Sequence, residues 1–379
     1  MRRLRPVIGA VVIVLAVAAP ASAADAVPQL PAKAQLVSQQ AAFRALAVSG
    51  LAQTRQLFWN PQKGWYMGRS NGDPPIASTW SSFPFMELVA AVAIDQPTAA
   101  SKAYVNRTFR AAEGYWDKTL GVNGSGGVSW LWGLTNTGTA YFDDAGWWGV
   151  SYLDAYRATG DKRWLWDAGR ALSWINGFGW DKKNGGTWWD TSQSHKTAEP
   201  LAAAAKIAAT LYDVTHRAYY LRIAKQYIAW ADAKTRVASR GNLYGRSATD
   251  DTVMDYVQGM MIDADIQLCT ALRQQSWCKK AEAVAAASVQ AFPVLADWAP
   301  EYDIVYERAL LDLYAVDHDP RWYAVAYANA ASAQAHSRAA DGTWSLKWDG
   351  SYQQPGTIYT QSATLQLFAW LAAVKPPAS

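Results

Sequence analysis

The segment WDKKNGGTWWD (residues 180–190) is the clearest copy of a pattern that recurs along this 379-residue chain. Each copy combines Trp or Tyr with Asp or Asn and usually Gly, and the copies follow one another at intervals of about 50–60 residues. The others are WNPQKGWY (59–66), YWD to WLW (115–132), RGNLYG (240–245), DWAP (297–300) and DGTWSLKW (341–348). A regular interval of this size indicates an architecture built from repeated units.

Between these aromatic loops, apolar residues recur at three- and four-residue intervals, which is typical of helices. The periodicity predicts helices over residues 32–57, 80–94, 98–113, 140–158, 161–177, 196–214, 217–235, 254–272, 277–291, 303–316, 320–337 and 358–373. Tight connections alternate with the long aromatic loops, so antiparallel helix pairs would place every long loop at one end. We therefore expect an all-α fold, an (α/α)6 toroid of six helical hairpins with long loops on one face; an open solenoid is the alternative.

Residues 1–23 have the pattern of a secretory signal peptide, with a basic start, an apolar segment and small residues at a cleavage site. The apolar segment, residues 7–19, is shorter than the ~20 residues that span a membrane. An uncleaved anchor is the alternative. No Pro-, Ser- or Gly-rich linker divides the remainder, so we expect residues 24–379 to form a single secreted domain, extracellular or associated with the cell wall.

Charge and cysteine content narrow the possible partners. Removing the three arginines of the leader lowers the formal charge from +4 to +1, which disfavours nucleic acid and polyanions as partners and suits a neutral polymer.

Cys269 and Cys278 are expected to form a disulfide in an exported protein. The four histidines lack ligand spacing, so we expect no metal and no cofactor; a calcium site at Asp250, Asp251 and Asp255 is the alternative. We also expect no membrane contact after cleavage, and a monomer.

The segment YFDDAGWWG (141–149) places two adjacent carboxylates, Asp143 and Asp144, among four aromatic side chains. Glycosidic-bond cleavage needs one carboxyl group that donates a proton and one that stays ionised. A helix N-terminus would favour the ionised form of Asp143, whereas the neighbouring charge and the aromatic surroundings should raise the pKa of Asp144. Such a pair titrates as a unit, so the position of the proton stays open. The alternative is that both residues only cap a helix.

Aromatic residues in the loops are candidates for sugar contacts, because a flat ring packs against the C–H face of a sugar. The chain has 21 Trp and 19 Tyr. The candidates in loops and beside the carboxylates are Trp130, Trp132, Tyr141, Trp147, Trp148, Trp188, Trp189 and Trp344, together with the carboxylates Asp190 and Asp255. By contrast, Trp164, Trp166, Trp174, Trp230, Trp322 and Trp370 fall within helical runs and are expected to pack between helices.

YFDDAGWWG, followed about 40 residues later by GGTWWD (185–190), resembles glycoside hydrolase family 76 over nearly the whole mature chain. That family contains bacterial endo-α-1,6-mannanases and fungal relatives thought to act as transglycosylases, on an (α/α)6 toroid. The resemblance implies a retaining mechanism in which Asp143 is the nucleophile and Asp144 the acid/base. It also adds Tyr256 and Gln258 to the expected substrate-binding residues.

The chain departs from the family pattern at positions that would contact sugar hydroxyls. Where the family usually has Tyr-Asn-Gln-Gly, residues 256–259 read YVQG, and residues 196–202 read KTAEPLA in place of a segment with two Asn. The reaction class depends less on these positions than the preference for mannose does. We therefore expect a secreted glycosidase that cleaves α-1,6-mannan or a related neutral α-mannoside polymer. The alternatives are a transglycosylase on the same site and a non-catalytic carbohydrate-binding toroid.

Overall fold

The computed structural model describes residues 27–121, 125–134, 138–292, 299–344, 347–350 and 356–378. The predicted signal peptide lies outside these residues, as do Asp297 and Trp298 of the fifth aromatic loop. Twelve α-helices occur in the described part of the chain, each within a few residues of a predicted one. They are α1 (Lys33–Phe58), α2 (Thr79–Asp95), α3 (Ala99–Ala112), α4 (Phe142–Thr159), α5 (Arg163–Trp174), α6 (Ala198–Thr215), α7 (Ala218–Lys234), α8 (Asp255–Leu272), α9 (Gln275–Ala291), α10 (Pro300–Asp317), α11 (Pro320–His336) and α12 (Ile358–Ala373).

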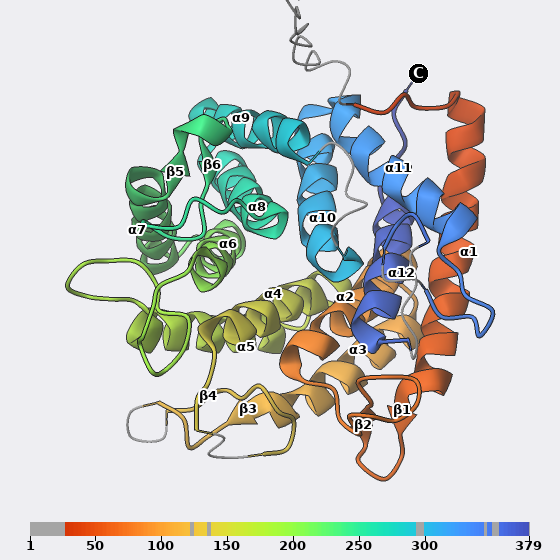
Figure 1. The fold of residues 1–379 in the computed structure, drawn as a ribbon, viewed down its shortest axis with the longest axis horizontal. Coiled ribbons are helices and arrows are strands. Elements are labelled where there is room, and N and C mark those ends of the chain that lie inside the picture. Colours follow the sequence, from red (N-terminus) through yellow and green to blue (C-terminus); the bar gives the residue numbers. More distant parts are fainter. Residues whose placement is uncertain are drawn as a thin grey trace, which may run out of the picture.

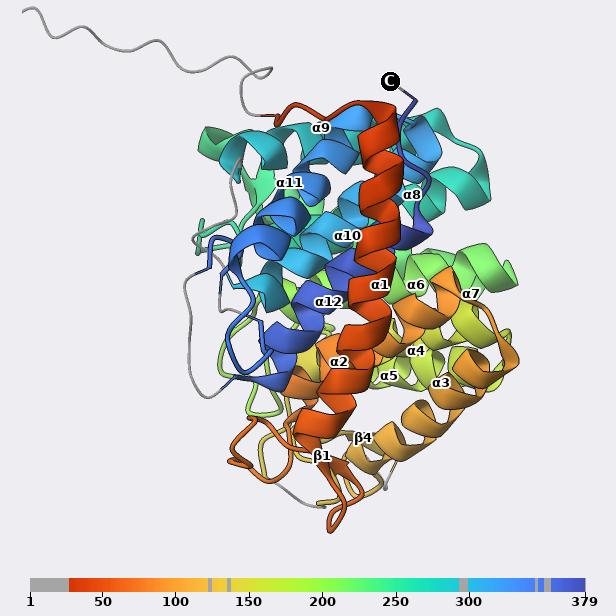
Figure 2. The same ribbon diagram turned by 90° about the vertical axis from the view of Figure 1, so that its right-hand side faces the viewer.

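The even-numbered helices form a closed inner ring, and the odd-numbered helices lie outside it (Figures 1 and 2). Around the ring, α2 packs on α4, α4 on α6, α6 on α8, α8 on α10, α10 on α12, and α12 returns to α2. The predicted toroid is therefore confirmed, and the open solenoid is wrong. Inner helices are buried on nearly every face, because they are packed on all sides and have no solvent-facing stripe; α12 is buried almost throughout.

Four of the six inner helices end in a left-handed residue, which starts the tight turn to the next outer helix; α2 ends instead at Gln96, with a φ of −127°. Gly160, His216, Arg273 and His318 have φ between 52° and 76° directly after α4, α6, α8 and α10. A left-handed residue at this point satisfies a free helix carbonyl and reverses the chain. After each turn the chain enters an outer helix, so all the inner helices run in the same direction.

The connection between α8 and α9 is further held by the predicted disulfide. Cys269 and Cys278 are bonded, with their Cα atoms 5.2 Å apart. None of the helices in the described part of the chain is long and apolar enough to cross a membrane.

The long loops contain three two-stranded hairpins that the sequence did not predict. They are β1 (Trp59–Asn60) with β2 (Trp65–Tyr66), β3 (Trp116–Asp117) with β4 (Gly127–Val128), and β5 (Arg236–Val237) with β6 (Leu243–Tyr244).

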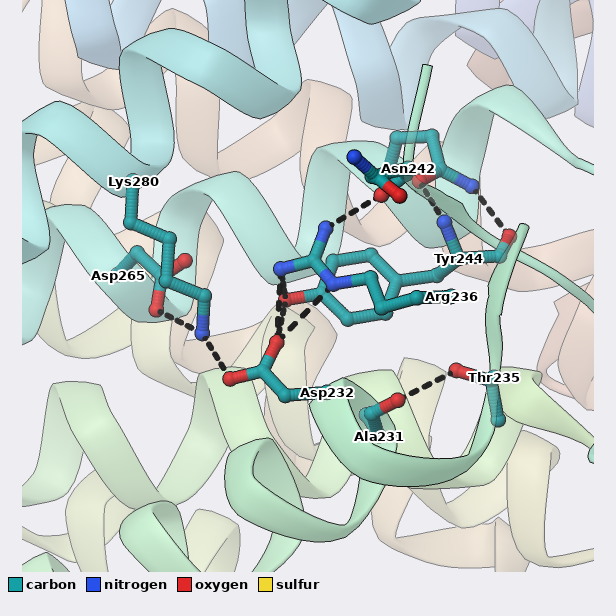
Figure 3. Close-up of polar contacts among 9 residues, drawn as sticks. Ala231, Asp232, Thr235, Arg236, Asn242, Tyr244, Asp265 and Lys280 are labelled. Atoms are coloured by element: carbon teal, nitrogen blue, oxygen red, sulfur yellow. Dashed lines mark hydrogen bonds and ion pairs between the residues drawn. The ribbon is translucent and has the colours of Figure 1, made fainter. Parts of the chain in front are cut away.

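Figure 3 shows how the third hairpin is fixed to the helices around it. Asp232 of α7 pairs with Arg236 at 2.7 Å and with Lys280 of α9 at 2.6 Å, and it accepts a hydrogen bond from the Tyr244 hydroxyl at 2.9 Å. Lys280 also reaches Asp265 of α8 at 3.5 Å. The loop is thus held rigidly above the ring.

Charged side chains occupy the interior of the ring two or three turns below the long-loop end. Glu87, Asp154, Lys206, Asp263 and Arg308 come from five different inner helices and are all buried, apart from a partly exposed Lys206. Lys206 pairs with Asp263 at 2.6 Å, and Arg308 reaches Asp154 at 3.3 Å from the opposite side of the ring. Buried charges persist only when they are paired; the first pair joins the neighbouring helices α6 and α8, and the second joins α10 to α4 across the ring.

Replacing Gly259 with Ala should destabilise the fold by about 1–3 kcal/mol, as overpacking of a core does. An added Cβ would lie 2.7 Å from the Val305 carbonyl oxygen and 2.7 Å from the Tyr306 Cα, both backbone atoms of α10. Alanine would otherwise favour the helix by ~1 kcal/mol. Urea unfolding followed by circular dichroism measures the change. Gly177→Ala, where no atom lies within 4 Å of the added Cβ, is the control; equal stability of the two variants would contradict the close packing of α8 on α10.

Candidate active site

A cavity of about 360 Å³ opens at the long-loop end of the inner ring. Most of its lining comes from the first turns of inner helices or the residues directly before them. The lining residues are Trp80, Tyr141, Asp143, Asp144, Trp147, Trp189, Glu199, Arg246, Tyr256 and Tyr302. Because the inner helices are parallel, their N-termini meet here, and their dipoles favour negative charge at this end.

Asp143 lies in the first turn of α4, and its carboxylate accepts two hydrogen bonds. Trp189 Nε1 donates to Oδ2 at 3.0 Å, and the backbone N–H of Asp144 donates to Oδ1 at 3.0 Å. The N-cap of α4 is Tyr141, which makes no side-chain capping hydrogen bond. Asp143 is therefore not the capping residue that the alternative interpretation required, and its carboxylate lines the cavity.

The two adjacent carboxyl groups have different proton affinities. Burial raises the pKa of Asp143 to about 6; the Trp189 hydrogen bond opposes this rise, and the negative charge of Glu199 adds to it. Burial, and then the negative charge of Asp143, raise the pKa of Asp144 well above its usual range. Asp144 is 7% exposed. Asp144 thus holds a proton over a pH range in which Asp143 is ionised, which answers the question that the sequence left open.

A second charged pair lines the cavity beside these carboxyls. Glu199, buried in the first turn of α6, forms an ion pair with Arg246, with 3.3 Å between Glu199 Oε1 and Arg246 Nε. The Arg246 side chain is 42% exposed, and its backbone binds the start of α6 through the Ala198 N–H at 2.7 Å. The pair therefore brings a donor-rich guanidinium to the mouth of the cavity and fixes it there.

Four of the aromatic residues that line the cavity contact one another and form a continuous wall. Trp80 lies 5.3 Å from Trp147 and 5.2 Å from Tyr302, between ring centroids. Tyr256 joins Trp147 at 5.9 Å and Tyr302 at 5.6 Å. Such a wall offers apolar faces to a sugar ring together with phenol and indole donors.

The structure brings six of the fourteen predicted site residues to this cavity: Tyr141, Asp143, Asp144, Trp147, Trp189 and Tyr256. Sequence reasoning missed Trp80, Glu199, Arg246 and Tyr302. Trp80 and Glu199 share a signal that could have found them, since each stands in the first turn of a predicted inner helix, as Asp143 does; Tyr302 lies in the first turn of α10, which begins three residues before the predicted helix. Arg246 lies in a loop and carries no such signal.

Four tryptophans predicted to contact sugar do not line the cavity. Trp132 stacks parallel to Trp65 and donates to the Ala111 carbonyl at 2.8 Å. Trp148 and Trp344 are buried in the core, whereas Trp130 is partly exposed outside the cavity.

Trp188 and Asp190 flank the cavity residue Trp189 but do not line the cavity. The Trp188 ring lies under the Lys196 ammonium at 4.7 Å. Asp190 is buried and accepts the backbone N–H of Ser192 at 2.7 Å, which shapes the turn after the Trp pair. Both residues hold the loop that presents Trp189.

Gln258, predicted to bind substrate, is fully buried and fastens the third hairpin instead. Its Oε1 accepts the Tyr244 N–H at 2.8 Å, and its Nε2 donates to the carbonyls of Tyr244 at 2.8 Å and Met254 at 3.0 Å. With its amide satisfied in this way, Gln258 has no free group for a sugar.

Asp255 is likewise buried behind the cavity wall, in contact with Asp303 of α10. Asp255 Oδ2 and Asp303 Oδ1 have no other donor, and burial raises the pKa of both groups. The two carboxyls therefore share a proton. In the described part of the chain, no group of three His, Cys, Asp or Glu side chains is arranged to hold a metal ion.

Comparison with known proteins identifies relatives of this fold and site. Residues 125–341 match the model of Glycosyl hydrolase family 76. A family 76 mannosidase from Bacteroides thetaiotaomicron superposes with a TM-score of 0.79 at 16% identity, covering 87% of this chain and 98% of that one. A family 76 α-1,6-mannanase from Salegentibacter gives 0.71 at 15% identity, covering 87% and 99%. No curated protein matches the chain in sequence.

The likeness extends beyond one family. Cellobiose 2-epimerase from Spirochaeta thermophila superposes with a TM-score of 0.65 at 14% identity, covering 89% of this chain and 98% of that one. At such identities the structural comparisons establish the shared toroid.

Asp144→Asn should raise the melting temperature at pH 7. The pKa of Asp144 is raised in the folded state, so the folded protein binds this proton more tightly than the unfolded chain does. Stability is therefore highest below the unfolded pKa of about 3.9 and falls as the pH rises toward the folded value. An amide does not titrate, so the advantage of the variant should vanish near pH 4. Calorimetry from pH 4 to 8 measures it, with exposed Asp251→Asn as the control. A variant less stable than the wild type at pH 7 would contradict the raised pKa.

Proposed function

The chain belongs to glycoside hydrolase family 76, and from this we propose that it hydrolyses α-1,6-linked mannan or a related neutral α-mannoside polymer. The observation that carries the proposal is the adjacent carboxyl pair, Asp143 and Asp144, in an aromatic cavity at the mouth of the ring; burial raises the pKa of both groups, that of Asp144 well above its usual range. One relative adds support: an inactive Salegentibacter α-1,6-mannanase with two consecutive Asp changed to Asn was solved with α-1,6-mannotriose.

In the first step, Asp144 donates its proton to the glycosidic oxygen while an Asp143 carboxylate oxygen attacks the anomeric carbon. The carbon–oxygen bond to the leaving sugar breaks, and that sugar departs as a neutral alcohol. A covalent glycosyl ester on Asp143 remains. The hydrogen bonds from Trp189 and from the Asp144 N–H fix the plane of the nucleophile before the reaction begins.

In the second step, the ionised Asp144 takes a proton from water, and the resulting hydroxide attacks the same carbon. The ester bond breaks, Asp143 regains its negative charge, and the product keeps the anomeric configuration of the substrate. While the ester exists, Asp143 carries no charge, so the pKa of Asp144 falls and Asp144 stays ionised, ready to accept a proton from water. One neighbouring charge thus switches Asp144 between acid and base.

The choice of sugar depends on the polar groups that line the cavity. Val257, which stands where the family usually has Asn, is apolar and buried. Polar contacts at the cavity must come from elsewhere, and Glu199 and Arg246 supply them. We therefore include related α-mannosides in the proposal along with α-1,6-mannan itself.

The enzyme is proposed to act outside the cell. The leader-like residues 1–23 and the pairing of Cys269 with Cys278 both suit an exported protein. A polymer substrate suits this location as well, because a long polysaccharide does not readily enter a cell.

Asp143→Asn and Asp144→Asn should each lower hydrolysis of α-1,6-mannan by at least ~10³-fold, because each step needs both carboxyl groups. Thin-layer chromatography of the products, and proton NMR of the first anomeric product, measure rate and stereochemistry. The wild type should release short oligosaccharides in the α configuration. Products longer than an oligosaccharide substrate would indicate transglycosylation instead. Binding without cleavage by the wild type would overturn the catalytic proposal in favour of a binding protein.

Hydrolysis should lose activity as the pH falls through about 6, where Asp143 becomes protonated. Glu199→Gln removes a negative charge that raises the pKa of Asp143, so the acidic limb of kcat/KM should move to lower pH. Glu113→Gln is the matched control, since Glu113 also pairs with an arginine, Arg170, but does not line the cavity. An unchanged limb in Glu199→Gln, or an equal shift in both variants, would contradict this assignment.

A further inference from the structure

A groove of about 960 Å³ runs along α5 on the outside of the ring, and it shares no lining residue with the active-site cavity. It begins at Trp116 and Gly126 of the β3–β4 hairpin, at the long-loop end, and reaches Arg217 and Tyr220 at the start of α7. The 12-residue α5 is about 18 Å long, so the α5 groove can hold several consecutive sugar rings.

Trp166 on this groove is the most exposed large hydrophobic side chain in the described part of the chain. It is 63% exposed, although its helical position predicted a place in the core. An exposed indole on a rigid helix is a common contact for ligands. A bound molecule that covered the Trp166 ring would remove apolar surface from water, which favours binding.

The Trp166 ring is also held still before any ligand arrives. The Arg170 guanidinium lies 4.3 Å from the Trp166 centroid and 4.1 Å from that of Trp116, between the two indoles. Arg170 is fixed in turn by ion pairs with Glu113, at 2.7 Å, and with Asp167. A preorganised ring loses little conformational entropy on binding.

The α5 groove combines aromatic rings with hydrogen-bonding groups, which suits a sugar chain. The Arg170 charge is compensated by its two carboxylate partners, and Lys162 and Arg217, which also line the groove, can donate to sugar hydroxyls. The hydroxyls of Tyr156, Ser173 and Tyr220 line its walls and can donate to or accept from sugar hydroxyls.

We propose that the α5 groove is a second, non-catalytic site that binds the polysaccharide substrate, with one sugar ring stacked on Trp166. The proposal rests on the function proposed above, because it takes the same neutral α-mannoside polymer as the ligand. A chain held on the outside of the ring keeps a long substrate near the mouth, which raises its local concentration without contributing to bond cleavage.

Trp166→Ala tests the proposal. We expect affinity for long-chain α-1,6-mannan, measured by affinity electrophoresis, to fall about five- to tenfold, the size of one lost sugar–indole contact. kcat and KM on α-1,6-mannotetraose at low concentration should stay within about twofold of the wild type, since Trp166 is remote from the cavity. Trp59→Ala, which removes another exposed Trp on a different face, is the control and should leave polymer affinity unchanged.

A second measurement does not depend on the variant. The Trp166 indole N–H resonance, assigned by its absence in Trp166→Phe, should shift when mannotetraose is added at millimolar concentration. Unchanged polymer affinity in Trp166→Ala, or an unmoved Trp166 resonance, would overturn the proposal. A Trp166-dependent affinity for an anionic polysaccharide or a protein, but not for mannan, would overturn it too. If the wild type bound mannan through Trp166 but never cleaved it, the proposed hydrolase function would be wrong, whereas the α5 groove would still be a polysaccharide-binding site.

Discussion

The packing of α12 on α2 closes the ring, and every functional feature of the molecule depends on this closure. Each inner helix alternates with an antiparallel outer helix, so all the inner helices run in one direction and their first turns meet at a single mouth. Residues that are far apart in the sequence, from Trp80 to Tyr302, become neighbours there. Close approach of the helices allows the closure: Gly259 leaves no room for a Cβ against the α10 backbone, and the Ala-rich α6 packs tightly between α4 and α8.

Burying two adjacent carboxyl groups at the mouth of the ring costs free energy, because the two negative charges repel each other. This repulsion keeps one carboxyl group protonated while the other is ionised. The helix N-termini and the Trp189 hydrogen bond favour an ionised Asp143, while burial and this charge keep the proton on Asp144. A second set of buried charges lies deeper in the interior of the ring. The Arg308–Asp154 pair spans the ring between α10 and α4, and it lies well below the mouth. The first turns of the inner helices therefore carry the candidate active site, and the turns below them carry the ion pairs that join the helices.

The toroid and the carboxyl pair could be predicted from the sequence because both depend on periodicity and adjacency. Helix positions follow from three- and four-residue spacing, and the alternation of tight and long connections decides their arrangement. Side-chain direction is not contained in these patterns. Trp132 and Trp148 lie in aromatic segments like that of Trp189, yet Trp132 anchors its loop to α3 and Trp148 is buried in the core. The side-chain amide of Gln258 is already hydrogen-bonded to the β5–β6 hairpin. Trp166 shows the converse, since a tryptophan at a helical position lies on the solvent side of an outer helix.

The most direct test of the site is the protonation of its two carboxyl groups. Carbon-13 NMR of the labelled Asp side chains, assigned with the two single Asn variants, follows each group as the pH is raised. The geometry predicts that Asp143 loses its proton near pH 6 while Asp144 keeps its own to higher pH. If both carboxyls titrated together near pH 4, as exposed Asp residues do, the division of roles between Asp143 and Asp144 would be contradicted.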